Sequence, residues 1–203
     1  MIAYKLTDEK MQTRGGCQWA LGETTRAKGK VFEPYTDGCL HLYESPEVVA
    51  FMAPLHGVEN YTRCFRVCTG RQVLNDGTKI GVRSATPLEE VLLPKPTLEQ
   101  RIYFVIQASL KFPQTPDYVA WADDWKSGRD RSYASACAAA YRADARPAAW
   151  SASAYIATEA AFRAAIRDAP AYAAAHAKRV DPTIDLHALA CEALAWIDPV
   201  GVK

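Results

Sequence analysis

The stretch that decides the fold runs from Tyr35 to Met52 and reads YTDGCLHLYESPEVVAFM. Asp37-Gly38 predicts a turn, and residues 39–43 then alternate polar and leucine side chains with the two-residue period of a half-buried strand. Ser45-Pro46 follows, a typical helix start in which serine caps the helix and proline takes its first position. The stretch therefore predicts a turn, a strand and a short helix over 46–53.

The rest of the N-terminal half is built from short strand patterns separated by turn residues. Asn75-Asp76-Gly77 is a strong turn signal, and glycines interrupt a long polar connection after the first strand. The further strands are predicted at residues 2–6, 61–68, 79–83 and 90–93. Such short runs pair most simply in an antiparallel manner, so residues 1–95 are predicted to form a small, mostly antiparallel sheet with one short helix.

From Thr97 the pattern becomes helical. Thr97-Leu98-Glu99-Gln100 is a capping box, Thr115-Pro116 starts a second helix, and Gly128 ends that helix. Three alanine-rich helices are predicted beyond it, separated by prolines. Their expected anchors are the few large side chains: Trp150, Tyr155, Ile156, Phe162, Ile166, Leu186, Leu189, Leu194 and Trp196. The predicted fold class is α+β, with an α+β module at 1–95 and an all-α, alanine-rich helical bundle at 96–203.

Composition excludes several classes of function. The 24 Lys+Arg and 23 Asp+Glu residues give a net charge of +1, spread evenly along the chain, which argues against nucleic acid as a direct partner. The six cysteines include no CxxC pair, so no zinc ribbon is indicated. No run of 18 strongly apolar residues occurs, and the first residues lack the apolar core of a signal peptide. We expect a soluble, non-exported protein without a membrane partner.

The N-terminal half resembles a domain of bacteriophage and prophage accessory proteins. The resemblance covers residues 2–107, and its most specific part is Asp37–Glu47, DGCLHLYESPE. Three further motifs take part: Ala3-Tyr4-Lys5, Arg63-Cys64-Phe65-Arg66-Val67 and Lys79-Ile80-Gly81. The resemblance brings no catalytic residue with it.

The C-terminal half is similar to the alanine-rich helical region of such phage proteins and of proteins described as immunity proteins. The shared features are Phe112-Pro113, Pro116, the helix end at Trp121–Gly128, and the alanine-rich helices after Asp130-Arg131-Ser132. Together the two resemblances imply a phage or mobile-element protein that acts in the cytoplasm of a bacterial host.

Two catalytic or metal-binding hypotheses involve cysteine and histidine. Cys39, His41, His56, Cys64 and Cys68 could in principle hold zinc, but Cys-x-His on a strand is not a recognised ligand spacing, and Cys64 and Cys68 would stand about 13 Å apart on an extended strand. Cys39 and His41 could form a nucleophilic pair only if the thiol were exposed and activated. Buried, inert thiols are the simpler interpretation, and neither a metal nor a cofactor is predicted.

An enzymatic alternative is an ADP-ribosyltransferase-like fold, which the order of strands loosely resembles. This resemblance implies that Glu89 or Glu90 polarises a hydroxyl group in the transition state. The nicotinamide ribose would be supported by His41, Tyr43 or Ser45. The first strand departs from that family, because it offers Tyr4-Lys5 where the family places an arginine or histidine.

The favoured hypothesis is a non-enzymatic binding protein. It would inhibit or modulate a bacterial host protein or defence complex, as anti-CRISPR proteins do. The candidate binding residues are His41, Tyr43, Ser45, Arg63, Arg66, Arg142 and Arg146. The alternatives are the ADP-ribosyltransferase-like enzyme and a protein that captures a nucleotide signal, which would need a deep pocket lined by His41, Tyr43 and Arg63 or Arg66. Homo-oligomerisation through the alanine-rich helices stays open.

Overall fold

The structure is a computed structural model of the chain. It describes residues 1–33, 36–52, 61–70, 74–111, 113–132, 135, 170–171 and 173–199. The chain divides into two compact units, Met1–Lys95 and Pro96–Lys203. Each unit is described by itself below.

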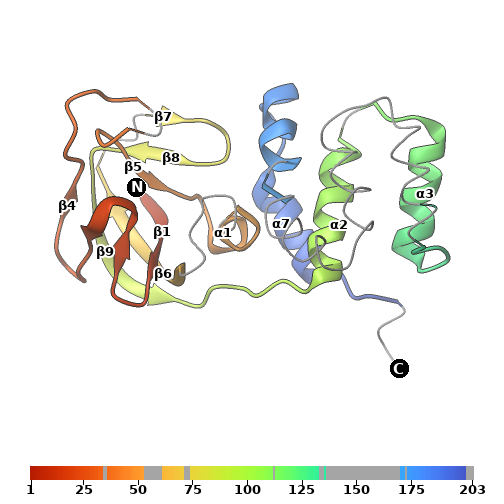
Figure 1. The fold of residues 1–203 in the computed structure, drawn as a ribbon, viewed down its shortest axis with the longest axis horizontal. Coiled ribbons are helices and arrows are strands. Elements are labelled where there is room, and N and C mark those ends of the chain that lie inside the picture. The colour runs from red at the N-terminus through yellow and green to blue at the C-terminus, as the bar shows by residue number, and fades with distance from the viewer. Residues whose placement is uncertain are drawn as a thin grey trace. The chain divides into compact units, whose positions relative to one another are not determined.

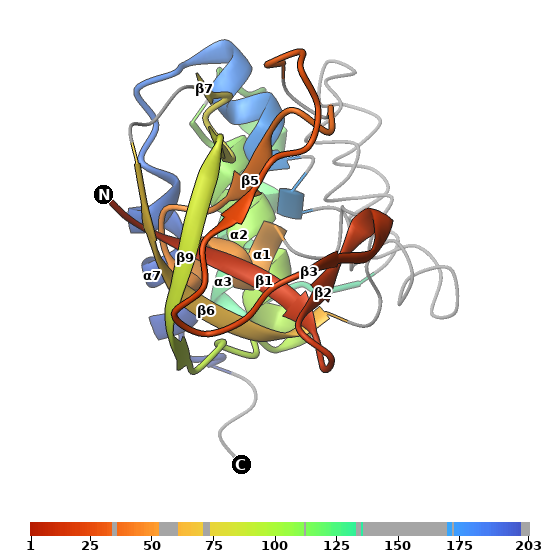
Figure 2. The same ribbon diagram turned by 90° about the vertical axis from the view of Figure 1, so that its left-hand side faces the viewer.

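The first unit is organised around a four-stranded antiparallel sheet of strand order β1-β6-β9-β4, whose first three strands run next to one another in Figure 2. Its strands are β1 (Ile2–Asp8), β4 (Thr25–Arg26), β6 (Tyr61–Thr69) and β9 (Ser84–Val91). In the central pair, Lys5 lies opposite Phe65 and Ala3 opposite Val67. This register places those four side chains on one face of the sheet.

A second, three-stranded sheet continues the first. It has the order β5-β8-β7 and consists of β5 (Leu40–Leu42), β7 (Leu74–Asn75) and β8 (Ile80–Val82). An isolated bridge joins it to β1, because Tyr4 N donates to Tyr43 O and Tyr43 N donates to Tyr4 O, each at 2.9 Å. A small hairpin of β2 (Gln12–Thr13) and β3 (Cys17–Gln18), linked by the 3-10 turn Arg14–Gly16, follows β1; Figure 1 labels β1, and Figure 2 labels the two strands of the hairpin.

The two sheets curl around one apolar core. Its buried members come from β1, β5, β6, β8 and β9 and from the segment after β3: Ala3, Trp19, Leu40, Leu42, Phe65, Val67, Ile80, Val82 and Ala85. Trp19 is the largest of the side chains that are almost fully buried. Burial of this apolar surface is the main favourable contribution to folding of the unit.

The short helix α1 (Pro46–Met52) follows β5. Ser45 Oγ accepts a hydrogen bond from Val48 N at 3.2 Å, so the predicted serine cap is confirmed. The helix prediction of 46–53 agrees with the described residues, and Ala53 lies outside them.

The strand predictions differ from the structure mainly at β9. Residues 90–93 were predicted as the strand, whereas β9 begins at Ser84 and ends at Val91. Pro87 makes the sequence look broken there, but the register between β6 and β9 shifts beside it, leaving Leu88 as the extra residue of a bulge. Proline is tolerated beside a bulge because a ladder hydrogen bond is missing there anyway.

The second unit is helical where it is described. Its elements are α2 (Leu98–Ser109), α3 (Pro116–Ser127), the helical residues 173–180 and α7 (Leu186–Ala195). The capping box of Thr97 and Gln100 and the left-handed cap at Gly128 are both confirmed. The expected anchors Trp150, Tyr155, Ile156, Phe162 and Ile166 lie outside the described residues. The described fold as a whole is therefore α+β.

Stacked aromatic rings fix the segment after α7. Trp196 stacks on Tyr103 with ring centroids 4.9 Å apart and on Trp125 at 5.7 Å. The guanidinium of Arg131 lies 4.6 Å from the Trp125 ring centroid and is bonded to Asp198 through Nη1, at 2.9 Å. Stacking, a cation–π contact and an ion pair thus hold this segment against α2 and α3. No helix among the described residues is long and apolar enough to cross a membrane.

Replacing Gly38 tests the packing of the turn that opens β5. A Cβ added at Gly38 would overlap the carbonyl oxygen of Val31, a backbone atom that cannot swing aside. We expect Gly38→Ala to lower the free energy of unfolding by about 3 kcal/mol, measured by urea denaturation. Gly70→Ala is the matched control, because nothing lies within 4 Å of its added Cβ, and it should change stability by less than about 0.5 kcal/mol. Equal losses in the two variants would contradict the expected clash.

Candidate functional site

The segment 39–45 lies where the two sheets of the first unit meet. In β5, Leu40 and Leu42 belong to the core, so His41 and Tyr43 point to the other face of the strand. Tyr43 is buried and bridges β5 to β1 through its backbone, whereas His41 is half-buried and lies opposite Gly81. Ser45 is buried and caps α1. These three predicted binding residues therefore also hold the sheet junction and the helix start.

Two lysines lie at the same junction; both belong to motifs of the phage-domain resemblance, but the sequence assigned neither of them a role. Lys5 Nζ donates to the backbone carbonyl of His41 at 2.9 Å and stands 5.2 Å from the centroid of the Trp19 ring. Lys79 is 6% exposed, and its Nζ stands 5.9 Å from the centroid of the Tyr43 ring. Lys79 is buried and Lys5 is half-buried, and since lysines are seldom buried, the two beside one histidine form an unusual cluster.

Burial and mutual repulsion shift the acid–base properties of this cluster. Burial, the largest cause, lowers the pKa of Lys79 to about 7, and the charge of Lys5 lowers it further while Asp76 opposes the shift. Burial likewise lowers the pKa of Lys5 to about 8. The pKa of His41 falls to about 4, first through burial and then through the charges of Lys79 and Lys5. The imidazole of His41 is accordingly neutral near pH 7, where Lys79 is partly neutral too.

A partly neutral lysine is a nucleophile in principle, and desolvation beside a second cation is one known route to it. A nucleophile must also reach its substrate, however, and Lys79 is buried. The arrangement is therefore best described as an interior polar cluster whose charge state changes near neutral pH.

The two-residue period of a strand is the sequence signal that points to Lys5. It places Lys5 on the same face of β1 as Ala3 and Thr7, which are both fully buried.

The predicted arginines do not form one site. Arg63 makes a two-pronged contact with Glu90, donating from Nε at 2.9 Å and from Nη2 at 2.6 Å. Arg66 Nε lies 2.6 Å from Glu89 Oε1. Because Phe65 pairs with Glu90 and Arg66 with Glu89, the two ion pairs lie on opposite faces of the sheet.

These ion pairs bear on the two alternative hypotheses. A carboxylate held by a guanidinium fork is not free to polarise a substrate hydroxyl, and burial is too slight here to raise its pKa; the hydrogen bond from Arg63 lowers the pKa of Glu90. A pocket for a nucleotide signal could be lined by Arg63 or by Arg66 but not by both. Arg142 and Arg146 lie outside the described residues.

The thiols of the first unit do not gather into a reactive or metal-binding group among the described residues. Burial raises the pKa of Cys39, and burial raises that of Cys64 to about 12, so both thiols stay protonated near neutral pH. Cys68 is exposed. Cys39 Sγ also fills the space that a side chain at position 81 would need. His56 of the zinc hypothesis lies outside the described residues.

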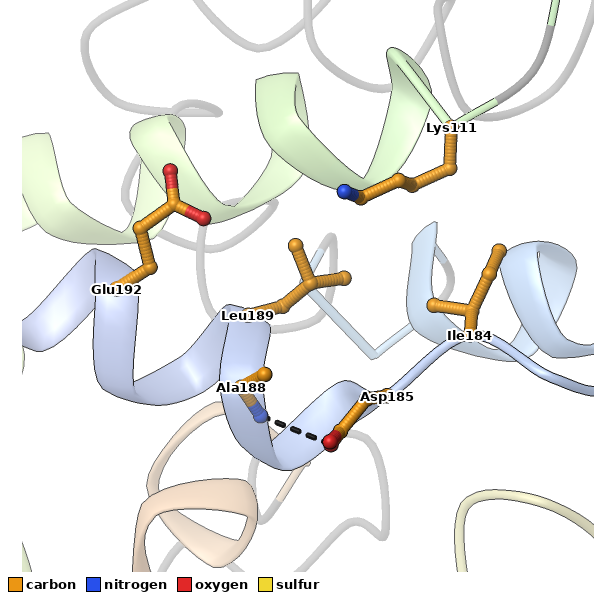
Figure 3. Close-up of a pocket in the computed structure, with 6 residues that line it drawn as sticks. All are labelled: Lys111, Ile184, Asp185, Ala188, Leu189 and Glu192. Carbon is orange, nitrogen blue, oxygen red and sulfur yellow. Dashed lines mark hydrogen bonds between the residues drawn. The ribbon is translucent and has the colours of Figure 1, made fainter.

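The second unit has a small hollow beside α7 (Figure 3). Its volume is about 170 Å³, and it is lined by Lys111, Ile184, Asp185, Ala188, Leu189 and Glu192. Asp185 is occupied as the cap of α7, accepting from Ala188 N at 2.9 Å, and Glu192 accepts from Tyr103 Oη at 2.7 Å. Ligand pockets are usually about 300–1,000 Å³. The hollow is therefore a surface depression between packed helices rather than a site for a cofactor.

No protein-family model matches the chain, and no curated protein or solved structure matches it either. Its function has to be argued from its own residues.

We expect His41 to make stability depend on pH below neutrality. Its pKa is about 4 in the folded chain against 6.5 for an ordinary histidine. Between these values the unfolded chain binds more protons, so the free energy of unfolding falls as pH decreases from 6.5 to 4, by at most about 3 kcal/mol. His41→Gln should remove this slope. NMR titration of the imidazole measures the folded value, and a midpoint above pH 6 would contradict the burial of His41.

We expect Lys79 to make the free energy of unfolding depend on pH in a higher range than His41 does. The folded chain releases the Lys79 proton near pH 7, whereas the unfolded chain keeps it up to about 10.5, so stability rises as pH increases from 7 to 8.5. Lys79→Met should flatten this rise and stabilise the protein at pH 6, where the native lysine is charged and buried. Urea denaturation from pH 6 to 8.5 measures both effects. Lys10→Met, at an exposed position, is the control, and the same flattening there would argue against the buried cluster.

Proposed function

We propose that this chain is a phage or prophage accessory protein that binds, and thereby inhibits or modulates, a bacterial host protein or defence complex, in the manner of anti-CRISPR or other anti-defence proteins. The observation that supports binding over catalysis is that the polar side chains required by the enzymatic alternative already have structural roles. Ser45 caps α1, and Glu89 and Glu90 are each held by an arginine. The sequence resemblance to phage accessory domains supports a site of action in the bacterial cytoplasm.

The open edge of β9 is the surface that we assign to the partner. β4 pairs with Ser84 and Ala85, and Gly22 N donates to Pro87 O at 2.8 Å, so the part of this edge that has no strand beside it among the described residues is 88–91. Leu88, the bulge residue, is 43% exposed, and Leu92, just past the strand, is 89% exposed. An extended segment of a partner could add to this edge through backbone hydrogen bonds and cover the two leucines.

The proposal for the C-terminal half concerns its fold and its contacts with other copies of the chain. We propose that it is an all-α bundle, and the described helices α2, α3 and α7 together with residues 173–180 support this. Alanine-rich helices allow close approach of neighbouring backbones, so the same half could also carry a homo-oligomeric contact.

The test expresses the full chain in bacteria that carry defined defence systems and measures both phage survival and co-purification with a defence component. We expect protection together with a stoichiometric partner. Leu88→Asp combined with Leu92→Asp should weaken both by at least about tenfold, because charges at the edge cannot be covered by an apolar segment. Val31→Asp, at an exposed apolar position away from this edge, should leave both unchanged. The proposal would be refuted if the chain gave no protection and co-purified with no partner in any of the defence systems.

Labelled NAD separates binding from the enzymatic alternative. Under the binding proposal no label passes to a host protein. Transfer of label that disappears in Glu89→Gln and Glu90→Gln would replace the proposal with an ADP-ribosyltransferase function.

A further inference from the structure

Helix α7 carries a histidine and a cysteine one turn apart on its exposed side. His187 and Cys191 are both exposed. The buried stripe of the helix lies on another face and consists of Leu186, Leu189, Ala190 and Ala193. Residues four apart in a helix project next to each other, so the two side chains form a pair.

The separation of this pair fits a metal ion. Cys191 Sγ lies 3.7 Å from Nε2 and 3.8 Å from Nδ1 of His187. A tetrahedral zinc ion with Zn–S of about 2.3 Å and Zn–N of about 2.0–2.1 Å requires an S···N separation of about 3.6 Å. The helix backbone therefore brings the two ligands close to the necessary distance. Because Sγ is nearly equidistant from the two ring nitrogens, it does not lie along the lone pair of either one, and a turn of the exposed imidazole about its Cβ–Cγ bond is needed to aim one nitrogen at the shared ion.

We propose that His187 and Cys191 form a binding site for a divalent metal ion of the Zn²⁺ type. On binding, the Cys191 thiol gives its proton to solvent, one Zn–S and one Zn–N bond form, and four water molecules leave the hexahydrated ion, so that two remain on the tetrahedral ion. Water fills the remaining coordination positions in the isolated chain.

The ligand types determine which metals the site accepts. A thiolate and an imidazole suit Zn²⁺ and Co²⁺, whereas Mg²⁺ and Ca²⁺ require oxygen ligands. Two ligands on one helical turn resemble the arrangement in which paired histidines four residues apart hold zinc. The site is independent of the interior lysine cluster and of the β9 edge, so it does not rest on the proposed function.

The experiment titrates the reduced full chain with Co²⁺ and then displaces it with Zn²⁺. We expect a thiolate-to-cobalt charge-transfer absorption that saturates at one ion per chain and is lost when Zn²⁺ is added. Zn²⁺ should also raise the midpoint temperature of unfolding, because an ion that binds only the folded chain stabilises it. Mg²⁺ should do neither.

Single variants assign the ligands. Cys191→Ser should abolish the absorption, and His187→Gln should weaken binding by at least about tenfold, since loss of a direct ligand costs no less than loss of a supporting group. Both substitutions lie on the exposed side of α7, and circular dichroism verifies that the helix is retained. Cys68→Ser and His176→Gln are the matched controls and should bind as the parent chain does. Absence of the absorption, or its survival in Cys191→Ser, would overturn the proposal.

Discussion

The first unit depends on the pair of backbone hydrogen bonds between Tyr4 and Tyr43. The chain passes from β8 of one sheet into β9 of the other through Arg83, and this bridge adds the backbone pairing that joins β5 to β1 among the described residues. With it, the core faces of the two sheets close around Trp19 and its apolar neighbours. The lysine cluster of this unit follows from that closure, because it brings Lys5 beneath the carbonyl of His41 and Lys79 beside the ring of Tyr43.

Closure of the two sheets also explains why the lysine cluster is energetically unfavourable and what offsets this cost. Desolvation disfavours charged amines, and two of them within reach of each other disfavour one another further. The fold tolerates this because each amine lies over an aromatic ring, whose face attracts a cation. The balance leaves the cluster close to a change of charge at neutral pH, while at the surface the hydrogen bond from Arg63 holds the pKa of Glu90 below its ordinary value. Interior and surface charges of the same small sheet thus respond to pH differently.

Local patterns were enough to predict the elements with strong signals. Alternation located β5 and β6 to within one residue at each end, and capping residues located α1, α2 and α3. The pairing of strands could not be predicted, because it depends on contacts between segments far apart in the chain. Pro87 hid the first half of β9, since a bulge is a property of two strands and not of one. The lysines were missed for a similar reason: Lys79 resembles a surface residue until β8 is placed beside β5. The pair on α7 is a local pattern, four residues apart, and could have been found from the helix prediction alone.

The segment after α7 has a consequence for where the second unit ends. Trp196 fills the space between the rings of Tyr103 and Trp125, and Asp198 neutralises Arg131 where that side chain covers Trp125. Residues 196–198 are therefore part of the folded body and not a dispensable tail. A chain shortened to the last residue of α7 would expose two aromatic rings and leave a half-buried guanidinium without its carboxylate, so the minimal folded length of this unit extends at least to Asp198.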